Sequence, residues 1–192
     1  MGPLDEPEAL LYFKTVCGRF LDCRFLHYNL PRAKRIIGGA EYDRICEAVP
    51  NLVATKNSST DYARTADLMR NAPRLQHFFL ERNFAMGCTL GECSLLCSHD
   101  GLYPKTTWRF FEAGVQRDLP ELFRIARLLW ETGEDLFAHC SRDMIDGSFD
   151  KTFAWLRDPS FSNRMLPPYI GFSEEESRKC REVYEKKYSQ IT

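Results

Sequence analysis

Apolar residues recur along most of this chain at spacings of three and four, which places their side chains on one face of an α-helix. Segments with this pattern are predicted helices, at residues 7–28, 40–48, 61–71, 74–84, 119–133, 134–145, 149–157 and 173–191. No alternating apolar run of convincing length predicts a strand, so any sheet is expected to be small. The pattern therefore predicts a mainly α protein that folds as a compact multi-helix bundle.

Two kinds of segment interrupt the helical pattern. Residues 51–60 are polar and are interpreted as a loop that leads into the next helix, and residues 88–104 combine turn residues with three cysteines. The chain is therefore expected to be one bundle or two helical subdomains joined by an irregular segment. The predicted domains are an N-terminal helical bundle, a Cys/His-containing connector and a C-terminal helical region, at residues 1–86, 87–104 and 105–192.

Polar residues mark the ends of the later helices. Asp118 followed by Glu121 is typical of a capping box at a helix start, and Gly133 is suited to ending that helix. Ser173 is the predicted N-cap of the last helix, because three glutamates follow it directly and basic residues fill the later turns.

Composition indicates a folded protein with little net charge. The chain has 192 residues, of which 44% are hydrophobic and 13% aromatic, so it can bury a core. Its formal net charge is −1, which leaves no basic excess for neutralising many phosphates. Any association with nucleic acid is therefore expected to be local or indirect.

The chain shows no membrane or secretion signal. No stretch approaches the roughly 18 apolar residues that span a bilayer, and the first residues are acids and prolines rather than a basic and apolar leader. An intracellular location follows, with no membrane partner. In a reducing compartment the eight cysteines are expected to be thiols or metal ligands.

One segment has the ligand types of a zinc site. Cys88, Cys93, Cys97 and His99 offer three thiols and an imidazole within twelve residues. They are the candidate metal ligands, and a structural zinc ion is the only candidate cofactor. The alternative is that the thiols are buried apolar groups and the histidine lies in a surface turn.

No catalytic motif stands out. The chain has no phosphate-binding loop, nucleophile elbow, HExxH motif or dinucleotide fingerprint. His139 and Cys140 are neighbours in a predicted helix, where their side chains point about 100 degrees apart and cannot pair. The prediction is therefore a non-enzymatic protein without an evident small-molecule substrate, although a Cys–His enzyme assembled from distant residues stays open.

Residues 8–85 resemble a death-fold interaction module of the caspase-recruitment kind. The order of the segments 41–45, 63–68 and 78–81, separated by a polar loop, is similar to the order of helices in that family. The resemblance implies a protein–protein interaction adaptor.

The segment from Tyr103 onward resembles the small nonstructural nuclear protein of bocaparvoviruses and related parvoviruses. The matching pieces occur in the family's order, namely Tyr103, Thr106, Thr107, Arg109, Gly114, Leu119, Glu121, Leu122, Trp130–Glu131, Asp135–His139, Phe153–Asp158, Cys180, Val183–Tyr184 and Lys186–Lys187. Cys180 stands alone where the family has paired cysteines, so zinc binding of the family's kind would need Cys140, His139 or the Cys88 group to complete a site.

This second resemblance implies a viral regulatory protein in the nucleus. Such a protein supports genome replication and viral pre-mRNA processing by binding host RNA-processing or replication proteins, without enzymatic activity of its own. Aromatic and neighbouring polar residues of this region are the candidate partner-binding residues, namely Trp108, Arg109, Phe137, His139, Phe153, Trp155, Arg157 and Tyr184.

Overall fold

The computed structural model describes residues 2–140 and 144–192, and it divides into two compact units, residues 1–96 and 97–192. The boundary between the units falls within the connector expected at residues 87–104. The expected limits of the flanking domains stay a prediction.

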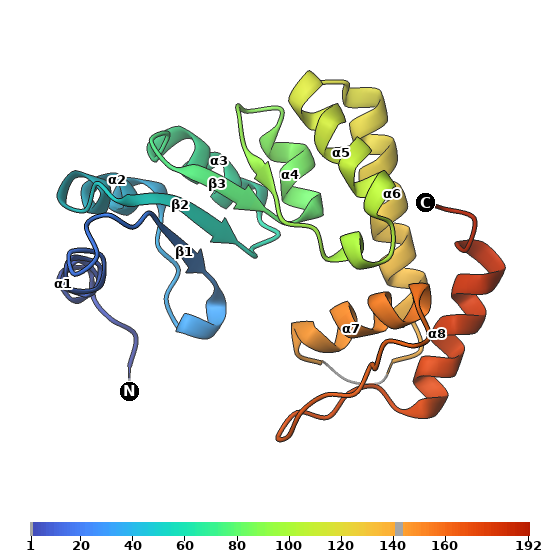
Figure 1. Ribbon diagram of the computed structural model, residues 1–192. Coiled ribbons are helices and arrows are strands. Elements are labelled where there is room, and N and C mark those ends of the chain that lie inside the picture. Colours follow the sequence, from blue (N-terminus) through green and yellow to red (C-terminus); the bar gives the residue numbers. More distant parts are fainter. Residues whose placement is uncertain (1, 141–143) are drawn as a thin grey trace. The chain divides into compact units, whose positions relative to one another are not determined.

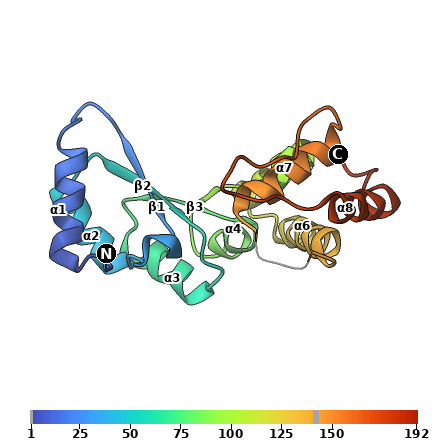
Figure 2. The same ribbon diagram turned by 90° about the horizontal axis from the view of Figure 1, so that it is seen from below.

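The first unit alternates helices with short strands. Its elements are α1 (Glu6–Cys17), β1 (Phe25–Asn29), a 3₁₀ helix (Pro31–Ala33), α2 (Gly39–Ala48), β2 (Leu52–Asn57), α3 (Tyr62–Asn71), β3 (Gln76–Phe79), α4 (Glu81–Gly87) and β4 (Ser94–Leu95). The four strands form one parallel sheet in the order β1-β2-β3-β4. Since right-handed crossovers join consecutive parallel strands, the connecting helices share one face of the sheet (Figures 1 and 2).

The prediction of a mainly α bundle is therefore wrong, because the first unit is an α/β structure. The helix expected over residues 7–28 ends at Cys17, and the residues from Phe25 onward form β1. The expected helix 74–84 is β3 followed by α4, and the expected loop 51–60 contains β2. The strands have between two and six residues, which is too short for a clear alternation of apolar and polar side chains.

The core of the first unit lies between the sheet and its helices. Large buried side chains from the four helices fill this space, namely Phe13, Tyr42, Ile45, Leu68 and Phe84. Helices α2 and α3 approach closely at Gly39, where an added Cβ would lie 2.5 Å from the backbone oxygen of Asp67. The Gly39 amide donates to the Asp67 carboxylate at 2.7 Å, which fixes the start of α2.

The second unit is helical, as the sequence predicts for this region. It contains a 3₁₀ helix (Ser98–Gly101), α5 (Pro104–Gln116), α6 (Leu119–Phe137), α7 (Asp146–Arg157) and α8 (Glu174–Lys187). The predicted caps at Asp118 and Ser173 are confirmed, since each side chain accepts a backbone N–H three residues later. Gly133 does not end its helix, which continues to Phe137. Of the expected helix 134–145, residues 141–143 lie outside the described residues.

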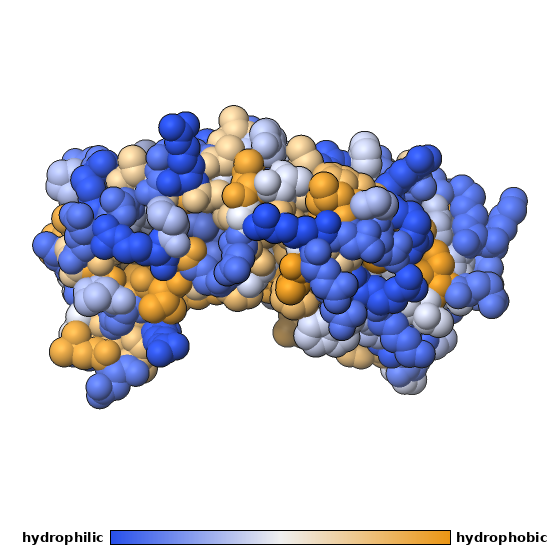
Figure 3. Space-filling view, turned by 90° about the horizontal axis from the view of Figure 1, so that it is seen from above, coloured by the Kyte–Doolittle hydropathy of each residue, from blue (hydrophilic) through white to orange (hydrophobic). Residues whose placement is uncertain are grey.

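On the face shown in Figure 3, hydrophobic residues appear as separate patches between hydrophilic ones. Within the described residues, every helix is too short or too polar to cross a membrane.

Candidate active site

The carboxyl ends of the parallel strands bring three side chains into one row. In the sheet register, Tyr28 of β1 pairs with Lys56 of β2, which pairs with Phe78 of β3. Because all strands run in the same direction, this row lies at a single edge of the sheet. Ligands of open parallel sheets bind outside the carboxyl ends of the strands, so this edge is the natural place for a site.

Alternation along the strands puts this row on the face away from the helices. The flanking residues His27, Thr55 and His77 form the adjacent row, and their side chains contact residues of the helical layer or its connections. Tyr28 and Lys56 therefore point to the opposite face, where both keep part of their surface exposed.

Lys56 is held against an aromatic ring. Its Nζ lies 4.0 Å from the centroid of the Tyr28 ring, within the range in which the face of an aromatic ring attracts a cation. No carboxylate in the described part of the chain forms an ion pair with Lys56. A lysine at a strand end, half-buried against an apolar surface and free of a salt bridge, is available for chemistry.

Directly behind this row, buried polar side chains form a hydrogen-bonded chain across three strands. Asn29 Nδ2 donates to Asn57 Oδ1 at 3.1 Å, and Asn57 Nδ2 donates to Thr55 Oγ1 at 2.8 Å. Thr55 Oγ1 lies 2.7 Å from His77 Nδ1, and His77 Nε2 lies 3.0 Å from the carbonyl oxygen of Ala72. Asn29, Thr55, Asn57 and His77 are each at most 3% exposed.

The direction of this chain sets the protonation state of His77. A carbonyl oxygen only accepts, so His77 Nε2 carries the proton and Nδ1 accepts from the Thr55 hydroxyl. The hydrogen bonds of this network therefore all run in one direction from donor to acceptor, and the His77 imidazole must be neutral. Burial lowers the pKa of His77, which favours the same neutral form. The network fixes the two residues that flank Lys56 in β2.

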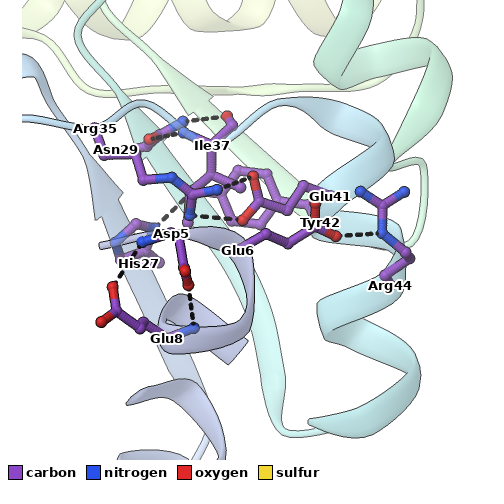
Figure 4. A network of polar contacts seen from close by, with 10 residues as sticks. All are labelled: Asp5, Glu6, Glu8, His27, Asn29, Arg35, Ile37, Glu41, Tyr42 and Arg44. Carbon is purple, nitrogen blue, oxygen red and sulfur yellow. Dashed lines mark hydrogen bonds and ion pairs between the residues drawn. The ribbon is translucent and has the colours of Figure 1, made fainter. Parts of the chain in front are cut away.

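Asn29 also holds the loop that follows Tyr28. Its side chain accepts from the Ile37 amide at 3.0 Å and donates to the Ile37 carbonyl at 2.9 Å (Figure 4). Arg35 of the same loop forms a 2.7 Å ion pair with Glu41 of α2. The loop beside the candidate site is therefore anchored at two points.

Replacing Asn29 by alanine is expected to lower the free energy of unfolding of the first unit by roughly 2–4 kcal/mol, since it leaves buried backbone groups of Ile37 without partners. Hydrogen exchange of the strand amides measures this loss. All three tryptophans lie in the second unit, so an unchanged tryptophan fluorescence transition provides an internal reference. The control is Asn71→Ala, which removes an exposed hydrogen bond and should cost less than about 0.5 kcal/mol. Equal effects of both variants would contradict the anchoring role.

The structure divides the predicted zinc ligands between the two units. Cys88 and Cys93 belong to the first unit, where their sulfur atoms lie 3.9 Å apart. The contact with Cys88, followed by burial, raises the pKa of the Cys93 thiol. Cys97 and His99 belong to the second unit, where His99 packs against Phe153 with ring centroids 4.8 Å apart. Zinc binding by these four residues stays a prediction.

The predicted partner-binding residues all lie in the second unit. Trp108 is 65% exposed on α5, and the neighbouring Arg109 pairs with Glu121 at 2.7 Å. Phe137 packs edge-on against the buried Phe153, with ring centroids 5.4 Å apart.

The remaining members of this set are less exposed or lie at helix ends. The ring of Trp155 faces the Arg181 guanidinium at 4.0 Å. His139 Nε2 is 2.8 Å from the Glu176 carbonyl, Arg157 is exposed at the end of α7, and Tyr184 is half-buried on α8. Their role in partner binding stays a prediction.

Comparison with solved structures shows which fold the chain has. The chain superposes on YagE of Escherichia coli, a prophage protein of the dihydrodipicolinic acid synthase family in complex with pyruvate, with a TM-score of 0.82 and 13% identity over 95% of this chain and 62% of that chain. The superposition on the dihydrodipicolinate synthase of Bacteroides thetaiotaomicron has a TM-score of 0.80 and 17% identity, over 95% of this chain and 62% of that chain.

A third solved structure is the Sulfolobus 2-keto-3-deoxygluconate aldolase in complex with D-KDPG, with a TM-score of 0.76 and 16% identity over 95% of this chain and 60% of that chain. The chain has the fold of these enzymes. This fold is α/β and resembles a TIM barrel. The chain spans about 60% of their length. No protein-family model matches the sequence, and no curated protein matches it.

These findings correct the functional predictions. The resemblance to parvovirus nonstructural proteins is wrong, and so is the caspase-recruitment resemblance, because the fold over 95% of the chain is that of the synthases and aldolases. A non-enzymatic viral regulator and a death-fold adaptor are therefore wrong as functions, and a Cys–His enzyme has no better support. The nuclear location and the host RNA-processing or replication partners depended on the viral resemblance, and no observation tests them.

The sequence did not identify Tyr28 and Lys56 as site residues, because Tyr28 was assigned to a helix and Lys56 to a loop. The sequence Leu-Val-Ala-Thr before Lys56 is a short apolar and β-branched run that ends in a polar segment. Such a run is consistent with a buried parallel strand, and a lysine at its carboxyl end is the signal that could have identified the site.

Proposed function

We propose that the chain carries the lysine of a Schiff-base-forming enzyme of the aldolase type, which makes or breaks a carbon–carbon bond next to the carbonyl of a 2-oxo acid. The observation that supports it is the position of Lys56 at the carboxyl end of β2, with Nζ over the Tyr28 ring. Enzymes of this fold include one solved with pyruvate and one solved with D-KDPG. A lysine amine is the side chain that forms Schiff bases with carbonyl substrates.

The chemistry begins with the neutral amine of Lys56. Its lone pair adds to the ketone carbon of the 2-oxo acid, and one proton moves from the nitrogen to the new alkoxide. A proton from solvent then lets the carbinolamine hydroxyl leave as water, and a protonated imine remains. The cationic imine accepts the electron pair of the carbon–carbon bond that breaks, while the hydroxyl on the departing carbon loses its proton to solvent, giving an enamine and an aldehyde; carbon–carbon bond formation runs in the opposite direction. The imine acts as the electron sink of the reaction.

The neighbours of Lys56 suit this cationic intermediate. The face of the Tyr28 ring favours positive charge at the nitrogen, both as ammonium and as protonated imine. Phe78 lies in register on the other side and adds an apolar surface. The buried hydrogen bonds that link Asn29 to His77 hold the strand that carries Lys56. The Lys56 Nζ is therefore positioned by rigid elements.

Reductive trapping tests this proposal. The full chain is incubated with pyruvate and sodium borohydride, which reduces an imine to a stable secondary amine, and the digested protein is mapped by mass spectrometry. The expected result is one adduct with the mass of a reduced pyruvate imine on the peptide that contains Lys56. Lactate, which has no ketone, is the matched control and should give none. A folded chain without an adduct, or with adducts spread evenly over its lysines, would overturn the proposal.

A further inference from the structure

We propose that His139, Cys140 and Cys180 form a zinc-binding site in the second unit. His139 and Cys140 follow the end of α6, and Cys180 lies on α8, which packs beside α6 (Figure 1). The three residues are far apart in the sequence and are brought together only by this helix pair. None of these residues belongs to the row at the strand ends or to the predicted set Cys88, Cys93, Cys97 and His99.

The spacing of the ligand atoms fits a single ion. One ligand atom from each of the three residues lies within 4.8 Å of the others. Cys180 Sγ and His139 Nε2 are 3.6 Å apart. Zinc–sulfur and zinc–nitrogen bonds of about 2.3 and 2.0 Å at a tetrahedral angle place these two atoms about 3.5 Å apart, so this pair needs almost no movement.

The chemical types of the ligands favour zinc. Two thiolates and one imidazole are the set found in sites that keep a fourth position open for water. Thiolate ligands disfavour magnesium and calcium, which prefer oxygen. Cys180 is fully buried, whereas His139 and Cys140 are partly exposed, which gives the ion a path from solvent.

The hydrogen bonds of these groups show what the ion would replace. The Cys180 thiol donates to the Leu136 carbonyl at 3.1 Å, and His139 Nε2 donates to the Glu176 carbonyl at 2.8 Å. Zinc would displace the thiol proton of Cys180, whereas His139 would bind the ion through Nε2 as a neutral imidazole with its proton on Nδ1.

Zinc binding by the full chain tests the proposal. The protein is stripped with a chelator, loaded with zinc alone, dialysed, and assayed for zinc per chain by atomic emission. One zinc per chain is expected, and His139→Gln, Cys140→Ser and Cys180→Ser should each weaken binding by at least about tenfold in competition with a chromogenic chelator. Cys23→Ser, at an exposed cysteine of the first unit, is the matched control and should leave binding unchanged.

Two results would overturn the site. One is a folded chain that binds no zinc while its thiols are reduced. The other is zinc that is retained by Cys140→Ser and Cys180→Ser but lost on replacing Cys88 or Cys97, which would place it at the ligands predicted from the sequence. The Cys140→Ser variant separates loss of a ligand from misfolding, because the Cys140 side chain is partly exposed. Its replacement leaves the buried contact of Cys180 with Leu136 in place.

Discussion

Replacing Lys56 by arginine is expected to abolish the pyruvate adduct and to reduce any aldol cleavage by the chain on the order of a thousandfold or more, as loss of a nucleophile does in other covalent enzymes. Arginine keeps the positive charge and can still face the Tyr28 ring. It stays protonated and cannot supply the amine lone pair that attacks a ketone. Trapping with borohydride and a coupled aldehyde assay measure the two losses separately.

Lys14→Arg is the matched control, because Lys14 lies on the exposed side of α1 in the same unit. It should trap pyruvate as the unmodified chain does. Far-ultraviolet circular dichroism checks that Lys56→Arg folds. A folded Lys56→Arg chain that still yields the adduct would show that another lysine carries the chemistry.

Much of α6, α7 and α8 in the second unit could be predicted from the sequence because their signals are local, whereas α5 was not predicted. A cap such as Ser173 with Glu176 lies within one helical turn, and the apolar face of α6 repeats within a single segment. These interactions form inside the element that they stabilise. A reading of neighbouring residues is therefore sufficient to find them.

The sheet could not be predicted in the same way, because its strands are short and pair over long distances in the sequence. β3 has four residues and β4 has two, which is too few for a periodicity to emerge. Pairing of Tyr28 with Lys56 joins residues of two strands separated by a whole helix. The helical spacing in residues 7–28 continued by chance from α1 into β1, and this concealed the strand that carries Tyr28.

The candidate site depends on that long-range pairing. Lys56 has no special neighbour in the sequence, and it becomes a candidate only when β1 places Tyr28 beside it. The proposed zinc ligands of the second unit also depend on packing, since Cys180 reaches His139 through the packing of α6 against α8. The sequence offered Cys140, His139 or the Cys88 group as partners of Cys180, and the packing of the helices selects the first two.

Acidification is expected to destabilise the first unit through the buried His77 and the partly buried His27. Burial lowers the pKa of His27 from 6.5 to about 4, and it also lowers the pKa of His77. Just below pH 6.5, His27 and His77 therefore become protonated in the unfolded chain but stay neutral in the folded chain. The stability contributed by each neutral histidine is fully present above that pH and is lost as the pH falls toward the folded value. For His27 alone the loss is roughly 3 kcal/mol.

The hydrogen bonds give this loss a structural reason. Protonation would put a second N–H on His77, at the nitrogen that accepts from the Thr55 hydroxyl. The donor chain that starts at Asn29 would then have two donors facing each other. His27 Nδ1 lies 2.7 Å from the Tyr42 hydroxyl in an apolar setting against the Phe13 ring, where a charged imidazole is poorly solvated.

Hydrogen exchange of the β1 and β2 amides at a series of pH values, with rates corrected for intrinsic exchange, measures this dependence. Protection should fall steeply between about pH 6.5 and pH 4.5, a range that ends before most carboxylates are protonated. His27→Phe fills the same space without a titratable group, so its protection should be lower at neutral pH and should depend less on pH. If the slope for His27→Phe equalled that of the unmodified chain, the buried neutral His27 would not be the group that links folding to pH.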